Sequence, residues 1–254
     1  MDIFQAIILG IVQGITEWLP VSSSGHLVLF EYFFGLSQPL IFDIMLHIGS
    51  LLVIILFFKK EILELIVGLF KWDKEKLMII LMIIIASIPI ALIGYFFKDA
   101  IELLFKDLRT VGFALLFTAA LLFLSRYPSK KTGKLTIWKA FTIGIFQSIA
   151  ILPGVSRSGS TISAGMMLGI KKEDAARFSF LIFIPAILGA LVLNVSDINS
   201  FSDPVPIIIG TLVSAIVGYF SLKLLMNIIK NNKFSWFSIY CLVLGLVVLA
   251  IAYF

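Results

Sequence analysis

The long apolar runs of this sequence constrain its fold more than any other feature. A helix needs roughly 20 mostly apolar residues to cross a bilayer, and six runs approach or exceed that length. With 60% of its residues hydrophobic and 14% charged, against about a quarter charged in soluble domains, the chain is predicted to be an all-α polytopic membrane protein. The predicted spans are Pro39–Phe58, Leu77–Phe97, Val111–Ser125, Phe178–Leu193, Val205–Ile229 and Phe234–Phe254.

The net charge of +5 is better explained by membrane topology than by a nucleic-acid partner, and no nucleic acid is expected. Basic residues gather in loops between the apolar runs, and such loops are typically cytoplasmic. The loops Gly35–Gln38 and Val195–Asp203 contain no Lys or Arg and are predicted to face outward, as are both termini. The loop Lys98–Arg109 fits less well, with three basic residues balanced by three acidic ones. The residues predicted to be cytoplasmic are Lys59, Lys60, Lys71, Lys74, Lys76, Arg126, Lys130, Lys131, Lys134 and Lys139.

Residues Gly10–Gly25 and Gly144–Gly159 form an internal repeat at a constant offset of 134. The two segments align without a gap and are identical at eight of sixteen positions. Apolar segments match Ile and Val by chance, but they seldom match a Gln and a Ser-x-Ser-Gly sequence in register, so we interpret the match as a duplication. Three spans lie between the copies, an odd number, which predicts an inverted-topology repeat. The shared pairs are Gly10/Gly144, Ile11/Ile145, Gln13/Gln147, Ile15/Ile149, Val21/Val155, Ser22/Ser156, Ser24/Ser158 and Gly25/Gly159.

Each repeated segment is interrupted by Pro and Gly, and is too short on either side of the break for two ordinary spans. We therefore predict a re-entrant helix-loop-helix hairpin in each half, because irregular backbone at membrane depth persists only where protein or water satisfies its polar groups. The chain is predicted to be a single membrane domain, 1–254. Its first repeat, 1–134, would be a hairpin at 1–34 and three spans, and its second repeat, 135–254, a hairpin at 137–168 and three spans. The two polar loops should meet near the membrane midplane.

The two interrupted segments hold the residues that suit chemistry. An ionisable residue inside an apolar segment is costly, so Glu17, His26 and Arg157 are candidates for function. Arg, hydroxyls and a helix N-terminus together suit an oxyanion with several acceptors, such as phosphate or diphosphate. A purely structural Glu17–Arg157 pair is the alternative, although it would not require the surrounding hydroxyls. The candidate phosphate-binding residues are Ser22, Ser24, Gly25, Ser156, Arg157, Ser158, Gly159 and Thr161.

Glu17 is also the candidate metal ligand. It shares a helix face with Gln13, four residues earlier, and the two could hold a divalent cation that bridges to phosphate, with Mg²⁺ as the expected ion and Ca²⁺ as the alternative. His26 suits proton transfer or attack on phosphorus near neutral pH. Asp43 and His47 lie four residues apart in the next span and are interpreted as polar packing residues, with a supporting pair behind the site as the alternative.

Two motifs carry a resemblance to a known family. The sequence from Gln13 to His26, Gln-Gly-Ile-Thr-Glu-Trp-Leu-Pro-Val-Ser-Ser-Ser-Gly-His, and that from Pro153 to Ile162, Pro-Gly-Val-Ser-Arg-Ser-Gly-Ser-Thr-Ile, resemble the bacterial undecaprenyl-diphosphate phosphatase family, also called bacitracin-resistance proteins. The likeness covers essentially the whole chain. It implies an integral membrane hydrolase that converts undecaprenyl diphosphate to undecaprenyl phosphate and inorganic phosphate, recycles the lipid carrier for peptidoglycan synthesis and confers bacitracin resistance.

The resemblance also implies roles for individual residues. The catalytic set maps onto Glu17, Ser23, His26 and Arg157, with Arg157 as the phosphate-binding arginine. Many members carry two acids where this chain has Gln13 and Glu17, which leaves Glu17 as the sole carboxylate of that pair. Whether Ser23, His26 or water attacks phosphorus stays open. The family further implies a polyprenyl diphosphate substrate among membrane lipids, the bacterial cell (inner) membrane as location and a site opening to the outer face, with monomer and homodimer both open.

A transporter is the main alternative, because inverted repeats with broken helices are a common transporter design. A phosphate or lipid-phosphate carrier would need Arg157 and the hydroxyls equally, whereas a Glu, Ser and His set beside the phosphate site indicates hydrolysis. Hydrolysis combined with flipping of the product lipid also stays open. A channel fits poorly, because the sequence has no ring of like charges or repeated filter sequence.

Overall fold

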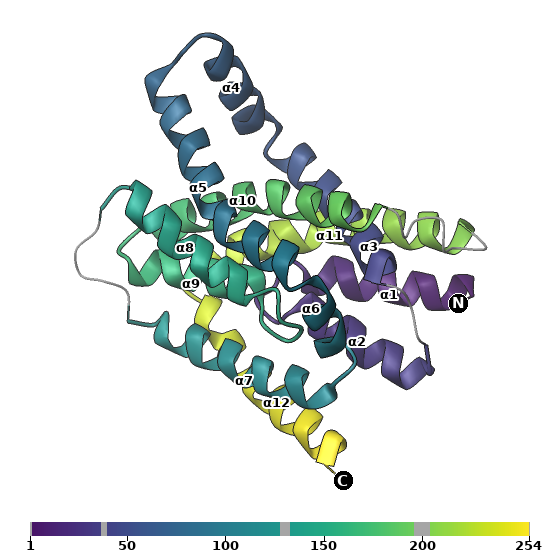
Figure 1. Cartoon of the computed structure of the whole chain (residues 1–254). Coiled ribbons are helices and arrows are strands. Elements are labelled where there is room, and N and C mark those ends of the chain that lie inside the picture. The colour runs from purple at the N-terminus through teal and green to yellow at the C-terminus, as the bar shows by residue number, and fades with distance from the viewer. Residues whose placement is uncertain (1, 37–39, 128–132, 196–203, 254) are drawn as a thin grey trace.

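The structure is a computed structural model of the chain, and it describes residues 2–36, 40–127, 133–195 and 204–253. These residues form helices and turns and contain no strand, which confirms the all-α prediction (Figure 1). The helices are α1 (Ile3–Thr16), α2 (Ser23–Phe34), α3 (Leu40–Phe57), α4 (Lys59–Phe70), α5 (Lys74–Phe96), α6 (Lys98–Leu104), α7 (Leu108–Leu124), α8 (Ile137–Ile149), α9 (Arg157–Met167), α10 (Lys172–Leu193), α11 (Val205–Lys230), the 3₁₀ turn η2 (Phe234–Trp236) and α12 (Phe237–Tyr253).

The predicted spans fall on helices of suitable length and composition. Within the described part of the chain, α5, α10, α11 and the segment formed by η2 and α12 are each long and apolar enough to cross a bilayer alone. The pairs α3 with α4 and α6 with α7 are bent by 77° and 92°, and each is either one broken span or a re-entrant loop. The protein is therefore a multi-pass membrane protein, with up to six spans as predicted.

Two segments predicted as loops contain helices, because α4 lies between Lys59 and Lys76 and α6 lies between Lys98 and Arg109. The segment that carries Lys59 to Lys76 is mostly helical, because α4 continues α3 after its bend and then reverses into α5 (Figure 1). Asp73 begins α5 as an N-cap whose side chain accepts from the amides of Glu75 and Lys76, the usual role of Asp at that position. The predicted outer loops Gly35–Gln38 and Val195–Asp203 lie mostly outside the described residues, as do Lys130 and Lys131.

Both predicted hairpins consist of two helices separated by a short break. In the first hairpin the break follows α1 at Glu17–Ser22, and in the second it follows α8 at Ala150–Ser156. The helices α8 and α9 begin 134 residues after α1 and α2, respectively, the same offset as the sequence repeat. Proline explains why neither hairpin is one continuous helix, because Pro20 and Pro153 cannot donate the backbone hydrogen bond that a helix interior needs.

Each hairpin packs against a span of the other half. Helix α1 lies along α11, and α8 lies along α5. The repeated glycines allow this approach, because a side chain at Gly10 would overlap the Gly210 backbone and one at Gly144 would overlap the Ala86 backbone. Small residues at such contacts are typical of helix packing in membranes. The last helices of the two halves, α7 and α12, also pack on each other (Figure 1).

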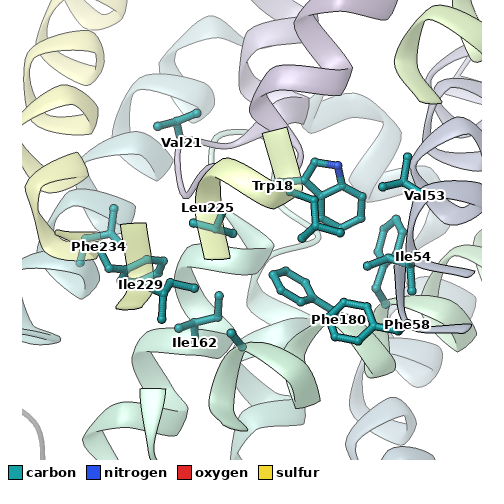
Figure 2. Close-up of a cluster of buried hydrophobic side chains, with 14 of the residues drawn as sticks. Trp18, Val21, Val53, Ile54, Phe58, Ile162, Phe180, Leu225, Ile229 and Phe234 are labelled. Atoms are coloured by element: carbon teal, nitrogen blue, oxygen red, sulfur yellow. The ribbon is translucent and has the colours of Figure 1, made fainter. Parts of the chain in front are cut away.

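The two breaks meet inside the helix assembly. A Cβ atom on Gly25 would lie 3.0 Å from the Gly154 Cα, and the Ser158 hydroxyl lies 3.5 Å from the Leu19 carbonyl oxygen. A buried apolar cluster lies beside this junction, with Trp18 packed edge-on against Phe180 and Phe183 (Figure 2). This packing fixes the polar breaks against each other.

Candidate active site

Glu17 is the centre of the polar site where the breaks meet. It is the C-cap of α1, directly after Thr16, and only 6% of its surface is exposed. Its Oε2 atom accepts a hydrogen bond of 2.6 Å from the Ser23 hydroxyl, and its Oε1 atom one of 2.7 Å from Nη2 of Arg157. The structure thus brings together three of the four residues predicted to be catalytic.

Ser23 and Arg157 occupy equivalent places in the two hairpins. Each is the first residue of the helix that follows the break, α2 and α9 respectively, so a single fold element repeated twice aims both side chains at Glu17. The helix N-terminus adds a partial positive charge at both places. An anion that displaced the Glu17 carboxylate would therefore meet a guanidinium, a hydroxyl and two helix N-termini.

Arg157 is held by more than its ion pair. Its Nη1 atom donates to the Ser179 carbonyl oxygen at 3.3 Å, and its guanidinium carbon lies 4.1 Å from the centre of the Phe183 ring. Thr161 bonds both the Arg157 carbonyl oxygen and the Ser179 hydroxyl. These contacts fix the guanidinium plane, which matters because arginine recognises phosphate through a rigid planar fork.

Two further side chains reach Glu17. Nε2 of Gln13 donates to Oε2 at 3.0 Å, and Nε2 of His47 lies 3.2 Å from the same oxygen. The interpretation of His47 as a packing residue is therefore wrong, because tertiary packing turns α3 so that His47 faces α1. Its Nδ1 atom bonds the backbone oxygen of Asp43 at 2.7 Å and not the carboxylate, so His47 supports the site through Glu17.

His26 lies apart from this cluster. Its ring nitrogens bond the Ser22 carbonyl oxygen and the Tyr240 hydroxyl, each at 2.7 Å, and among the described residues it makes no hydrogen bond to Ser23 or Glu17. The geometry therefore favours Glu17 over His26 as the group that accepts a proton from Ser23.

The other predicted phosphate-binding residues shape the two breaks. Ser22 and Ser156 are the N-caps of α2 and α9, and their hydroxyls accept from the amides of Gly25 and Gly159. Ser24 and Ser158 lie 3.3 Å from these capping hydroxyls. Ser22 has a φ of 69°, a strained conformation for a residue other than glycine that is typical of functional sites.

The burial of charge is the main electrostatic feature of this site. Taking an ion pair out of water costs several kcal/mol per ion, and hydrogen bonds must offset that cost. Here the side chains of Glu17 and Arg157 are 4% and 13% exposed, and Glu17 accepts from hydroxyl and amide donors as well as from Arg157. The Glu17–Arg157 pair does join the two hairpins, as the structural alternative required, but it is surrounded by the hydroxyls that phosphoryl chemistry needs.

Comparison with known proteins identifies the family. The model of the family described as bacitracin resistance protein BacA matches residues 6–247. The chain belongs to this family. It is 42% identical to the undecaprenyl-diphosphatase of Carboxydothermus hydrogenoformans, over 99% of this chain and 98% of that protein. It is 40% identical to the undecaprenyl-diphosphatase of Methanosphaera stadtmanae, over 99% of both chains.

Some residues of this BacA-family site were not singled out by sequence reasoning. Ser179 and Tyr240 touch Arg157 and His26, and Thr118 bonds both the Gly154 carbonyl oxygen and the Ser156 amide at 3.0 Å. Ser179 lies on α10, Tyr240 on α12 and Thr118 on α7. These helices are outside the repeated motifs, and a single hydroxyl in a membrane helix is too common to indicate a site. Their relevance follows from their contacts alone.

Proposed function

We propose that this protein is an integral membrane phosphatase that hydrolyses undecaprenyl diphosphate to undecaprenyl phosphate and inorganic phosphate. The observation that carries the proposal is the buried Glu17 carboxylate, hydrogen-bonded on one oxygen to Ser23 and on the other to Arg157. Full-length relatives named undecaprenyl-diphosphatase support the substrate. Return of the carrier lipid to peptidoglycan synthesis, and with it bacitracin resistance, would follow from this activity.

The first chemical step is transfer of the terminal phosphoryl group to Ser23. As the Ser23 oxygen bonds to phosphorus, its proton passes to Oε2 of Glu17, 2.6 Å away, and the bond to the bridging oxygen breaks. Undecaprenyl phosphate leaves with that oxygen and its electron pair. Arg157 stabilises the charge on the phosphoryl oxygens, the usual source of phosphoryl-transfer catalysis.

The second step returns Ser23 to its free form. Glu17 first loses the Ser23 proton to solvent. It then accepts a proton from the water whose oxygen bonds to phosphorus, and it passes this proton to the Ser23 oxygen as the bond between that oxygen and phosphorus breaks, which releases inorganic phosphate. Direct attack by water without the phosphoserine is the alternative, and His26 as nucleophile is less well supported because its two ring nitrogens bond the Ser22 carbonyl oxygen and the Tyr240 hydroxyl. Acid quenching with a ³²P-labelled substrate separates these routes, because only the first leaves label on Ser23.

A divalent cation is part of the proposal. The Gln13 Oε1 atom is buried without a hydrogen-bond partner among the described residues, which leaves it able to bind a cation. The Gln13 Nε2 atom donates to Glu17, and the Glu17 oxygens accept from Ser23 and Arg157, so Glu17 would join Gln13 as a ligand only after substrate displaced these donors. Within the described ranges no group of three His, Cys, Asp or Glu side chains could hold a metal ion, so Mg²⁺ or Ca²⁺ would need further oxygen ligands from substrate or water. When bound, the cation would neutralise part of the diphosphate charge.

The remaining proposals concern location. The substrate implies the bacterial cell membrane, and the family resemblance implies that the site opens to its outer face, with both termini on that side in the predicted topology. Labelling of single cysteines introduced at Lys74 and at Asp2 with a membrane-impermeant reagent tests this orientation, because only the Asp2 position should react in intact cells. The native Cys241 is fully buried, so it should contribute little background.

Phosphate release by the purified protein tests the activity. In detergent with a long-chain prenyl diphosphate and Mg²⁺, the wild type should release phosphate, and Glu17→Ala and Arg157→Ala should lose most of this activity while remaining monodisperse. His26→Ala should also lower it, because His26 bonds the Ser22 carbonyl oxygen directly before Ser23. Tyr219→Phe is a matched control, because Tyr219 lies on α11 and, among the residues that the structure describes, makes ring contacts with Phe57 and Phe220 and no hydrogen bond through its hydroxyl. Absence of release by folded wild type with varied cations would refute the hydrolase and favour the transporter.

A further inference from the structure

The catalytic candidate His26 is clamped by a residue from the other half of the chain. The Tyr240 hydroxyl lies 2.7 Å from Nε2 of His26, across 214 residues of sequence. The two rings are nearly parallel, with centroids 5.8 Å apart and an interplanar angle of 8°. Tyr240 is 47% exposed whereas His26 is 7% exposed, so the hydrogen bond joins a buried histidine to a tyrosine at the surface of the helix assembly.

The hydrogen bonds determine which ring nitrogen carries the proton. Nδ1 of His26 lies 2.7 Å from the Ser22 carbonyl oxygen, and a carbonyl can only accept, so Nδ1 is the protonated nitrogen. In the neutral ring Nε2 is then an acceptor, and the Tyr240 hydroxyl donates to it. Both nitrogens are engaged, which fixes the ring orientation and selects one tautomer.

The neighbouring residue on α12 strengthens this clamp. The Cys241 thiol donates to the Pro20 carbonyl oxygen at 3.4 Å, which lies in the break between α1 and α2. One turn of α12 therefore holds the break and the first turn of α2 at once. A carbonyl freed by a helix break needs such a partner inside a membrane.

We infer that Tyr240 is a positioning residue for the phosphatase reaction and acts through His26, a role that rests on the proposed function. Its hydroxyl holds the His26 ring in the orientation in which Nδ1 bonds the Ser22 carbonyl oxygen, directly before Ser23 in the chain. A tyrosine that only packed α12 against α2 would need its ring but not its hydroxyl.

The Tyr240→Phe variant separates these roles, because it removes the hydroxyl and retains the ring. We expect kcat for phosphate release to fall about tenfold, the loss expected of one hydrogen bond that positions the site, with KM within about twofold of wild type. Tyr219→Phe is the control, since that tyrosine is similarly exposed at 43%, and it should behave as wild type. An unchanged kcat in Tyr240→Phe overturns the inference.

A second readout does not depend on activity. The chain has two histidines, so ¹⁵N-histidine NMR of His47→Gln protein reports His26 alone. With Tyr240 present, Nδ1 should be protonated and Nε2 an acceptor, whereas adding Tyr240→Phe should shift Nε2 and populate the second tautomer. A fall in kcat with an unchanged tautomer would also overturn the inference, because Tyr240 would then act by another route. If wild type releases no phosphate, the proposed function fails, while the NMR comparison still tests the clamp.

Discussion

Gly154 is the position where the structure makes its sharpest prediction. It lies in the break of the second hairpin with a φ of 99°, and a Cβ atom there would lie 2.5 Å from the Val111 carbonyl oxygen and 2.8 Å from the Ala114 Cβ. Its own carbonyl oxygen accepts from Thr118 at 3.0 Å. The Gly154→Ala substitution therefore meets both backbone strain and occupied space.

The expected loss of stability follows from these two terms. A non-glycine residue in a sparsely populated backbone region costs about 1–3 kcal/mol, and a methyl group forced into filled space costs about 1–3 kcal/mol more. The free energy of unfolding should therefore fall by about 2–6 kcal/mol. For a chain of this size that corresponds to a drop in Tm of about 4–24 °C.

Activity should fall further than stability alone explains. The same Thr118 hydroxyl accepts from the Ser156 amide at 3.0 Å, and Arg157 follows directly. Displacement of the break by about 1 Å would misplace the guanidinium, and an error of that size costs about 10²-fold in rate. Thermal unfolding in detergent and phosphate release below the lowered Tm measure the two effects separately.

Gly189→Ala is the matched control. Gly189 lies inside α10, and a Cβ atom there would have no atom within 4 Å, so the substitution should leave Tm unchanged or raise it, since alanine favours a helix interior over glycine. A Tm for Gly154→Ala equal to that of Gly189→Ala would refute the argument that the break of the second hairpin is tightly packed.

Further substitutions and a metal test follow from the site and core. Arg157→Lys should lower kcat/KM by about 10²–10³-fold, because lysine keeps the charge but loses the fork, and a near-normal rate would contradict this. His47→Ala should lower phosphate release by about tenfold while His47→Gln restores much of it, since the amide can still bond Glu17; equal defects would contradict a hydrogen-bonding role. Trp18→Ala should cost about 3–5 kcal/mol in thermal or chemical unfolding, because Trp18 is fully buried. Chelation with EDTA should abolish release and added Mg²⁺ or Ca²⁺ should restore it, and full activity after chelation would remove the cation from the proposal.

The helices were largely predictable because membrane constraints are simple. Each predicted span needed only a long apolar run, and the breaks at Pro20 and Pro153 were visible because proline cannot continue a helix. The helical continuation of α3 into α4 was not predictable from hydropathy. The charges that ended the apolar run, Lys59 and Lys60, are compatible with helix as well as with loop, so composition gave the end of the apolar run but not the end of the helix.

The candidate site was predictable only in part. Glu17 and Arg157 were selected because charge is rare in apolar segments, and Ser23 because the motif resembles that of a known family, and the structure brings the three within hydrogen-bond distance. His47 was interpreted with Asp43 as a polar packing residue, because nothing in the sequence indicated that its side chain meets Glu17 on another helix. Tyr240 carried no signal, because its partner lies 214 residues away.

The sequence alone determined that the chain is helical, lies in a membrane and repeats a polar hairpin, since run length, proline and motif identity act locally along the chain. Only the tertiary structure decided which side chains share a hydrogen bond. The packing of α1 on α11 and of α8 on α5 sets how the two breaks meet, and a helix rotated by one residue about its axis would turn its polar side chain away. Distances between residues far apart in the chain depend on that packing, which the local sequence pattern does not determine.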